Sequence, residues 1–521
     1  MISLLALSFV ALCILTRLAW EILHWYFYKH YSGLPDIEKL DKAGPGQRLD
    51  GTAIICGGRY FFERVIIVEP EEWLTSEDGM RRFGREQEHK RSRVMQYQSL
   101  HICQALLYKG LERLFPDLEE QSRYSGISIL PADRKNSFAG TPITAPFKSY
   151  DGNLPNTLYC GRAGLETLIR RLVLGRGSYP RIEQITGTVT GVIPDNDSRS
   201  ISKVTVRGTD LQLQNLDAAL VIDCTGVTRA GMKWLSQAGF GKSGSEPCPN
   251  GGVQLQDAKI SFDQKLNYST LTCDVPPSIL KKLPFPPNDN PETAPQYVFL
   301  EDQQDKGRRL LLFGGESSDK QMKYESLDAF RSMLHEVVPF KDPVPDWVFQ
   351  TIDILEESEV IFNYSHIRVP GSTYIQYHKT VNLPNNFAAL GDSVSSGCTK
   401  VMLGAVALHT ALSTGLVPGS KKLPSSFGQR FFKEHYNKTD IFWSVSVIRH
   451  YGIPCTDPLP GEDLESGQLA RWYLRRLQIL ATKDEQAARV FWDGAMGFAT
   501  AVDPFHPWLM MKVFWSAAIG K

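Results

Sequence analysis

Three segments of the chain each contain an apolar run that leads into glycine, aspartate or glutamate. Such residues at the end of an apolar run could bind a nucleotide cofactor. The segments are residues 52–69 (TAIICGGRYFFERVIIVE), 218–226 (AALVIDCTG) and 387–394 (FAALGDSV). Short apolar runs are typical of buried strands, and a doubly wound sheet places the ends of its strands beside a dinucleotide. The order and wide spacing of the segments therefore predict one cofactor site assembled from distant parts of the chain.

A fourth segment, YCGRAGLETLIRRL at residues 159–172, places Arg162 at the start of an expected helix. Together with VIDCTG and the pair Gly391 and Asp392, it resembles FAD-dependent monooxygenases of the p-hydroxybenzoate hydroxylase type, particularly the membrane-anchored fungal ones of secondary metabolism. The resemblance covers most of residues 50–521. It implies FAD as the cofactor, NAD(P)H as the co-substrate and a hydrophobic small molecule as the substrate.

The resemblance also implies which residues contact the cofactor. Glu69 would bind the adenosine ribose, Asp392 would bind the ribityl chain, and Asp223 would order the turn before Gly226 rather than touch the cofactor. Arg162 would approach the cofactor from a helix start. The predicted cofactor-binding set is Gly57, Gly58, Glu69, Arg162, Asp392 and Gly397.

Two cofactor loops are shorter than in the family. Only residues 57–64 separate the expected first strand, 53–56, from the second, 65–68, whereas a parallel crossover needs about a dozen residues or more. We therefore expect a tight turn between two strands that are not parallel neighbours, with roughly ten to fifteen residues missing. A second gap precedes Gly397, which we align with the last glycine of the family's flavin loop. Each of three alternatives would explain these gaps. The gene model lacks coding segments, the protein is a degenerate relative that has lost tight flavin binding, or it is a working enzyme with a rebuilt loop.

The composition excludes several classes of function. Lys and Arg number 57, as do Asp and Glu, so there is no net basic charge to attract nucleic acid. The nine cysteines form no CxxC pair and have no zinc spacing, so we expect reduced thiols and no metal site. A chain of 521 residues suggests two to four domains.

The N-terminus is strongly apolar. Residues 2–16 are almost wholly apolar, and an aromatic cluster follows Arg17. A bilayer crossing needs about 20 apolar residues, and basic residues behind the segment would face the cytosol. We therefore expect a single-pass anchor, in the endoplasmic reticulum membrane, with a cytosolic body. A buried core helix is the alternative. Residues 507–520 form a second apolar stretch that could lie on a membrane or pack on the body.

The predicted fold class is α/β. A doubly wound FAD-binding domain carries an inserted antiparallel substrate sheet, a helical C-terminal region and an N-terminal membrane helix. The predicted divisions are residues 1–28 (anchor), 29–50 (linker), 51–251 and 381–424 (FAD-binding), 252–380 (substrate sheet) and 425–521 (helical). The charge-dense residues 77–93 are expected to be exposed around the cofactor's entrance.

The function expected from the resemblance is hydroxylation or epoxidation of a hydrophobic metabolite. The alternatives are a flavin oxidoreductase that inserts no oxygen, and a cofactor-poor homologue that serves as a binding protein. The catalytic residues stay unassigned. Arg93, Gln96 and Tyr97 match a family stretch near the flavin, and His366 and Tyr377 could donate protons, although such residues are more often structural.

Overall fold

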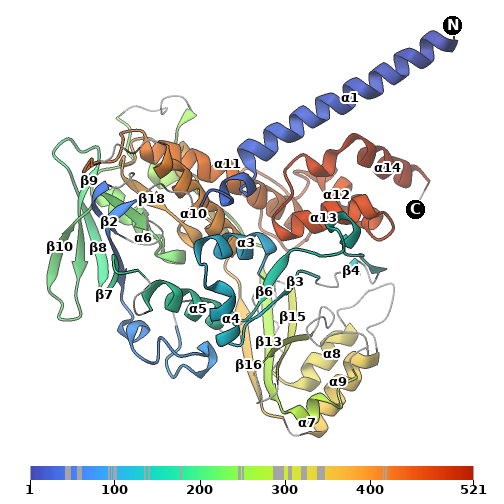
Figure 1. Cartoon of the computed structure of the whole chain (residues 1–521), viewed down its shortest axis with the longest axis horizontal. Helices are drawn as coiled ribbons and strands as arrows, with labels where there is room; N and C mark the ends of the chain where they lie inside the picture. Colours follow the sequence, from blue (N-terminus) through green and yellow to red (C-terminus); the bar gives the residue numbers. More distant parts are fainter. Residues whose placement is uncertain are drawn as a thin grey trace.

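The fold is taken from a computed structural model of the whole chain (Figure 1). It describes all residues except 1, 41–48, 55–60, 92–93, 95–96, 98–102, 134–136, 139–140, 176–178, 245–247, 249–250, 285–297, 303–307, 318, 320–324, 337–345, 359, 415, 417–418 and 520–521. The predicted residues Gly57, Gly58, Arg93 and Gln96 therefore lie outside the described part.

A five-stranded parallel sheet forms the centre of the molecule. Its order is β18 (Phe387–Ala389), β11 (Leu220–Asp223), β1 (Leu49–Ile54), β2 (Phe62–Glu69) and β7 (Ile182–Thr186). The short apolar strands β11 and β18 are buried along their whole length, as expected for a sheet covered on both faces. The predicted α/β fold with a parallel sheet is thereby confirmed.

The central sheet packs against helices and against a second sheet. Apolar side chains of α10 (Cys398–Ser413) and α11 (Phe427–His450) join those of β1, β11 and β18 in the largest core. The same core receives side chains from an antiparallel sheet of β8 (Thr188–Pro194), β9 (Ile201–Arg207) and β10 (Leu213–Asp217), and from α6 (Ala230–Gln237). One hydrophobic interior therefore unites residues far apart in the sequence.

A four-stranded antiparallel sheet lies below the centre in Figure 1. Its order is β14 (Val298–Asp302), β15 (Arg308–Ser317), β13 (Leu266–Val275) and β16 (Phe362–Arg368). Helices α8 (Leu327–Glu336) and α9 (Asp346–Glu357) cover one face, where β13 contributes Leu271, Cys273 and Val275 to a separate core. Strands β12 (Lys259–Phe262) and β17 (Ser372–Ile375) form a two-stranded sheet, and in the sequence they come directly before and directly after the four strands of the antiparallel sheet.

The remaining elements flank these sheets. They are α2 (Leu34–Ile37), α3 (Ala105–Leu114), α4 (Leu118–Tyr124), α5 (Arg162–Leu174), α7 (Pro277–Leu280), α12 (Gln468–Ala481), α13 (Glu485–Met496), α14 (Pro507–Ala518), β3 (Ser128–Pro131), β4 (Ser137–Phe138), β5 (Thr141–Pro142) and β6 (Asn156–Tyr159).

The first two strands correct a prediction, because β1 and β2 are parallel neighbours. Ala53 pairs with Val65, and Leu49 pairs with Phe62. Because Phe62 lies beside Leu49, the chain after Ile54 has to span the length of β1, which is five residue steps or about 17 Å. The eight residue steps from Ile54 to Phe62 can span about 26 Å when extended, which is more than this distance. A helix-containing crossover is therefore not needed, and the expectation that these strands cannot be parallel neighbours is wrong.

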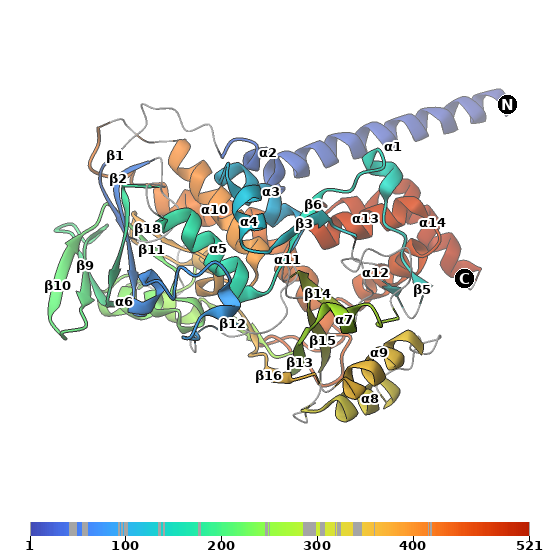
Figure 2. The same cartoon turned by 60° about the horizontal axis from the view of Figure 1, so that its bottom comes forward.

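The N-terminal helix corrects a second prediction. Helix α1 (Ile2–Tyr31) runs away from the body, as Figures 1 and 2 show. Within the described residues, none of the helices combines the length and the apolar character that a bilayer crossing requires. Arg17 and Glu21 form an ion pair in the middle of α1, and Lys29 and His30 occupy its last turn. The predicted single-pass anchor and the location derived from it are therefore wrong.

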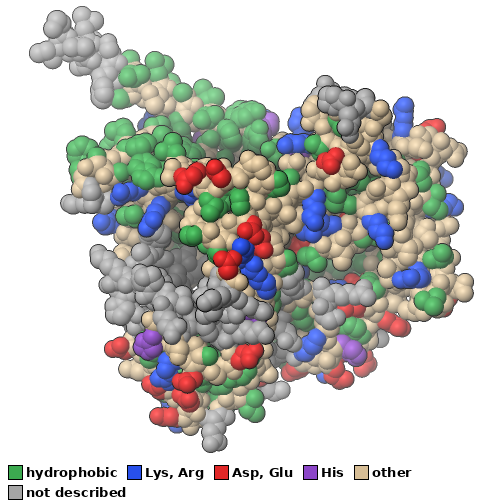
Figure 3. All heavy atoms as spheres, turned by 180° about the vertical axis from the view of Figure 1, so that it is seen from behind, with side chains coloured by type: hydrophobic (Ala, Val, Ile, Leu, Met, Phe, Trp, Pro, Cys, Tyr) green, Lys and Arg blue, Asp and Glu red, His purple; other side chains and the backbone are tan. Residues whose placement is uncertain are grey.

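The second half of α1 instead contacts the C-terminal helices. His24 Nε2 lies 3.0 Å from Asp503 Oδ1, and the rings of Trp20 and His506 pack edge to face. Helix α14 packs on the body through the fully buried Leu509 and Val513. Figure 3 shows apolar side chains gathered over α1 and α14 on the surface.

We expect the buried Asn386 to be required for the junction between the central sheet and the three-stranded sheet. Its side chain accepts a hydrogen bond from the Ile201 N–H (2.8 Å) and donates to the carbonyls of Ile201 (2.8 Å) and Ala219 (3.2 Å). Asn386→Ala should lower the free energy of unfolding by about 2–3 kcal/mol, because backbone groups lose buried partners. Chemical denaturation measures this. Asn385→Ala is the matched control, and an equal loss in both variants would contradict the assignment.

Candidate functional site

The carboxyl ends of three parallel strands bring the predicted site residues to one edge of the sheet. Glu69 ends β2, Asp223 ends β11, and Gly391 and Asp392 follow β18. Because β1, β2, β11 and β18 all run in the same direction, their carboxyl ends share this edge. In open α/β sheets, ligands bind in the crevice outside these ends.

Asp223 orders this edge. It is fully buried, and its Oδ1 accepts hydrogen bonds from the Thr225 N–H (2.8 Å), the Thr225 hydroxyl (2.7 Å) and the Ser393 hydroxyl (3.1 Å). Its Oδ2 accepts the N–H of Gly231, at the start of α6, at 3.1 Å. A Cβ at Gly231 would lie 2.4 Å from Oδ2, so glycine is needed there. The carboxylate is occupied by the chain itself, which agrees with a role in turn geometry.

Asp392 has a different environment. It is half-buried and accepts no hydrogen bond from the described part of the chain. It follows Gly391, whose φ of 62° lies in the left-handed region that glycine adopts freely. The positive charges of Arg229 and Lys400 are close enough to interact with it. Its oxygens are therefore available to the hydroxyls of a ligand.

Gly397 begins α10 on this side of the sheet. Its φ of 127° is a conformation that other residues rarely adopt. A Cβ there would lie 3.1 Å from Cε of Lys400, so the missing side chain also makes room for that lysine. The first N–H groups of a helix have no partner within the helix and carry the positive end of its dipole. The start of α10 is therefore suited to an anionic group.

Arg162 connects α5 with α10. It is the first residue of α5, and its Nη1 lies 3.4 Å from Sγ of Cys398, the first residue of α10. Its Nε lies 3.9 Å from Oε2 of Glu166, one turn further along α5. Arg162 thus adds positive charge beside the start of α10, and its side chain is 32% exposed.

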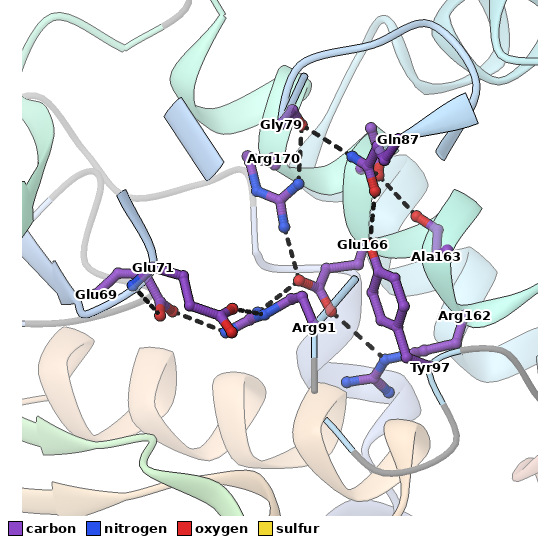
Figure 4. A network of polar contacts seen from close by, with 11 residues as sticks. Glu69, Glu71, Gly79, Gln87, Arg91, Tyr97, Arg162, Ala163, Glu166 and Arg170 are labelled. Atoms are coloured by element: carbon purple, nitrogen blue, oxygen red, sulfur yellow. Dashed lines mark hydrogen bonds and ion pairs between the residues drawn. The ribbon is translucent and has the colours of Figure 1, made fainter. Parts of the chain in front are cut away.

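Glu69 belongs to a network of charges centred on Arg91 (Figure 4). Arg91 contacts Glu69 (3.0 Å), Glu71 (2.7 Å) and Glu166 (2.5 Å) through its three nitrogens, and Glu166 also contacts Arg170 (2.7 Å). Burial raises the pKa of Glu69, although Arg91 and the N–H of Glu71 lower it. The network joins the end of β2 to α5 and fixes the orientation of Glu69.

Arg91 is a site residue that the sequence alone does not reveal. Residues 77–93 were expected to be exposed, yet the Arg91 side chain is only 17% exposed. The density of charge in this segment was the available signal, but a charge run does not reveal which member lies beside a strand end. Lys400 has no such signal in the sequence, because only the fold of the turn before α10 brings it near Asp392.

Three further candidate residues make contacts within the fold itself. Tyr377 is 2% exposed and stacks on Phe432 within the main core, so it does not reach a substrate surface. The buried Tyr97 donates a hydrogen bond to Gln87 (2.7 Å), and burial raises its pKa to about 12. His366 Nδ1 lies 3.2 Å from the Ser269 hydroxyl on the neighbouring strand of the antiparallel sheet.

The residues on this edge fit a flavin dinucleotide. A carboxylate has about four acceptor positions, and the described contacts of Glu69 use two of them, so it can still accept ribose hydroxyls. Asp392 offers its whole carboxylate, and α10 offers its N–H groups beside Arg162. The link after β1 includes Gly57 and Gly58 and lies outside the described residues.

Comparisons with known proteins support the fold. No protein-family model matches the chain, and no curated protein matches it. A flavoprotein/dehydrogenase from Cytophaga hutchinsonii aligns with a TM-score of 0.50 at 13% identity, over 91% of this chain and 100% of that chain. The flavin-dependent brominase Bmp2 aligns with a TM-score of 0.49 at 12% identity, over 91% and 100%. The first alignment shows that this chain shares the fold of that protein, at an identity too low to carry over an activity.

We expect Asp223→Ala to lower the free energy of unfolding by about 3 kcal/mol, because four donors at this edge lose a buried acceptor. Thermal and chemical unfolding of the purified protein measure this change. Asp217→Ala, at a side chain that is 87% exposed, is the control and should be nearly neutral. A stable Asp223→Ala protein would contradict the structural role.

We expect Arg91→Met to destabilise the protein by about 3–5 kcal/mol at pH 7, because three partly buried carboxylates lose their shared cation. Arg123→Met, at an exposed ion pair, should change stability by less than about 1 kcal/mol. Denaturant titrations of both variants beside the unaltered protein provide the comparison.

The same variant should show a defined pH dependence. The pKa of Glu69 is already raised by burial, and loss of Arg91 raises it further. A carboxyl whose pKa is raised on folding costs stability as the pH rises above its unfolded value of about 4.3. The stability deficit of Arg91→Met should therefore shrink as the pH falls from 7 to 5. A deficit that grows over this range would argue against the network.

Proposed function

We propose that the protein is an FAD-dependent monooxygenase that hydroxylates or epoxidises a hydrophobic small molecule with NAD(P)H and O₂. The observation that carries the proposal is the placement of Glu69, Asp392 and the start of α10 along the carboxyl edge of one parallel sheet. The residue types match the parts of a flavin dinucleotide: acceptors for its hydroxyls, and N–H groups with cations for its diphosphate.

The chain's own residues would hold and orient the cofactor. Glu69, fixed by Arg91, would accept the adenosine ribose hydroxyls, and Asp392 would accept those of the ribityl chain. Arg162 and the first turn of α10 would neutralise the diphosphate. Bound flavin would accept a hydride from the nicotinamide and activate O₂, so the protein needs no metal or nucleophile of its own for this chemistry.

The antiparallel sheet is the proposed substrate side. Helices α8 and α9 cover one of its faces, and the sheet lies within residues 252–380, which the sequence predicts to face the substrate. The proposal includes a role in secondary metabolism and a hydrophobic substrate. It also includes the absence of a nucleic-acid partner. A flavin oxidoreductase without oxygen insertion has the same site. Incorporation of ¹⁸O from O₂ into the product, with matching NAD(P)H consumption, would distinguish the two.

A cofactor-poor binding protein is the second candidate. Its support is the link between β1 and β2, which has only seven residues (55–61) and cannot contain the helix that usually binds the pyrophosphate. Flavin absorbance of the purified protein separates the candidates. Stoichiometric FAD supports the enzyme, and a folded, colourless protein that takes up no added FAD supports the binding protein.

We expect Asp392→Ala to lower flavin content more than Asp223→Ala does, per folded molecule. A hydrogen bond to a charged group contributes about 1.5–3 kcal/mol, so the affinity for FAD should fall at least roughly tenfold. Equilibrium titration with FAD measures it, and Asp392→Asn, which keeps an acceptor, should lose less. Equal flavin content in Asp392→Ala and Asp223→Ala would remove Asp392 as a direct ligand.

A further inference from the structure

Lys400 is a cation in an unfavourable position. It is the third residue of α10, where the helix dipole places positive potential and where acidic residues are favoured. Its side chain is partly buried and folds back over Gly397 towards the turn that follows β18. Its Nζ donates a hydrogen bond to the Ser395 hydroxyl at 2.8 Å. A neutral hydroxyl does not offset the cost of placing a cation there.

Two arginines lie on the same side of the sheet as Lys400, at the start of α10 and beside Asp392. Arg162 reaches the first residue of α10, and Arg229 lies near Asp392, which is the acidic group that acts on Lys400 among the described residues. His435 of α11 lies close to Lys400, and burial lowers its pKa to about 4, so it is neutral at pH 7. Burial lowers the pKa of Lys400 to about 8, which leaves it mostly protonated at pH 7.

The link between β1 and β2 is where a dinucleotide-binding sheet usually supplies positive potential. The link of residues 55–61 is too short for the helix whose N–H groups usually face the pyrophosphate. A cation supplied from α10 would take the place of those N–H groups. Lysine binds phosphate as a point charge, which does not require the flat geometry of an arginine pair.

We propose that Lys400 is a cofactor-binding residue that contacts the diphosphate of the dinucleotide from the first turn of α10. The inference rests on the proposed FAD site and adds to it a group that discriminates between ligands. FAD should depend on Lys400, whereas riboflavin, which has no phosphate, should not. In the absence of ligand, Lys400 opposes folding, because it is a partly buried cation at the positive end of a helix.

The test compares Lys400→Met, which removes the charge and keeps the length, with Lys400→Arg, which keeps the charge. Lys433→Met is the control, since Lys433 is exposed on α11. Binding of FAD and of riboflavin is measured by fluorescence titration of the flavin-free protein. Lys400→Met should weaken FAD binding about ten- to a hundredfold and leave riboflavin binding unchanged. Lys400→Arg should recover part of the FAD affinity, and Lys433→Met should match the unaltered protein.

Thermal unfolding of the flavin-free protein, with and without inorganic pyrophosphate, gives an independent readout. Without ligand, Lys400→Met should melt at or above the temperature of the unaltered protein. Pyrophosphate should stabilise the unaltered protein and Lys433→Met, but not Lys400→Met.

The outcomes separate the two proposals. If the unaltered protein binds no flavin but loses its pyrophosphate stabilisation in Lys400→Met, the FAD enzyme fails and the anion site at Lys400 stands. Unchanged FAD affinity in Lys400→Met, or an equal loss of riboflavin, would overturn the role of Lys400 while leaving the FAD site in place. A protein that responds to neither flavin nor pyrophosphate would overturn both.

Discussion

The buried carboxylate of Asp223 is the interaction on which the arrangement of the site depends. It sits at the end of β11 and accepts hydrogen bonds from the turn that follows, from the start of α6 and from Ser393 beyond β18. A buried carboxylate is stable only when its acceptors are occupied, so these segments must meet at one point. That requirement sets the path of the turn bearing Asp392 and hence the start of α10.

The charged groups along the edge of the sheet form two regions. At the end of β2, Arg91 balances three carboxylates and holds Glu69 in place with acceptor capacity to spare. Near α10, Lys400 and Arg229 interact with the single carboxylate of Asp392, and Arg162 lies beside the start of the helix. The end of β2 is suited to sugar hydroxyls, and the region near α10 offers the Asp392 carboxylate to hydroxyls and its cations to an anion. A dinucleotide carries both kinds of group, which is why the two regions support one ligand.

The two corrected predictions have a common cause, since each applied a general length rule to a particular segment. The crossover rule assumes that a helix covers the sheet, but β1 and β2 are short enough for a seven-residue link (55–61) to return along them. The apolar N-terminus was judged by its first fifteen or so residues, but Arg17, Glu21 and Lys29 share the same helix, and Trp20 and His24 contact the C-terminal region. The path between β1 and β2 and the position of α1 each depend on the elements that pack beside them.

The amino-acid sequence by itself determined the strands and their polar ends, because apolar runs closing on Glu69, Asp223 and Asp392 encode burial followed by a chemical group at short range. The tertiary structure alone decided what those groups meet. Arg91 reaches Glu69 across 22 residues, Ser393 reaches Asp223 across 170, and Arg162 reaches Cys398 across 236. Charges and hydrogen bonds act through space over a few ångströms, so partners this distant in the chain become defined only when the packed sheet and helices bring them together.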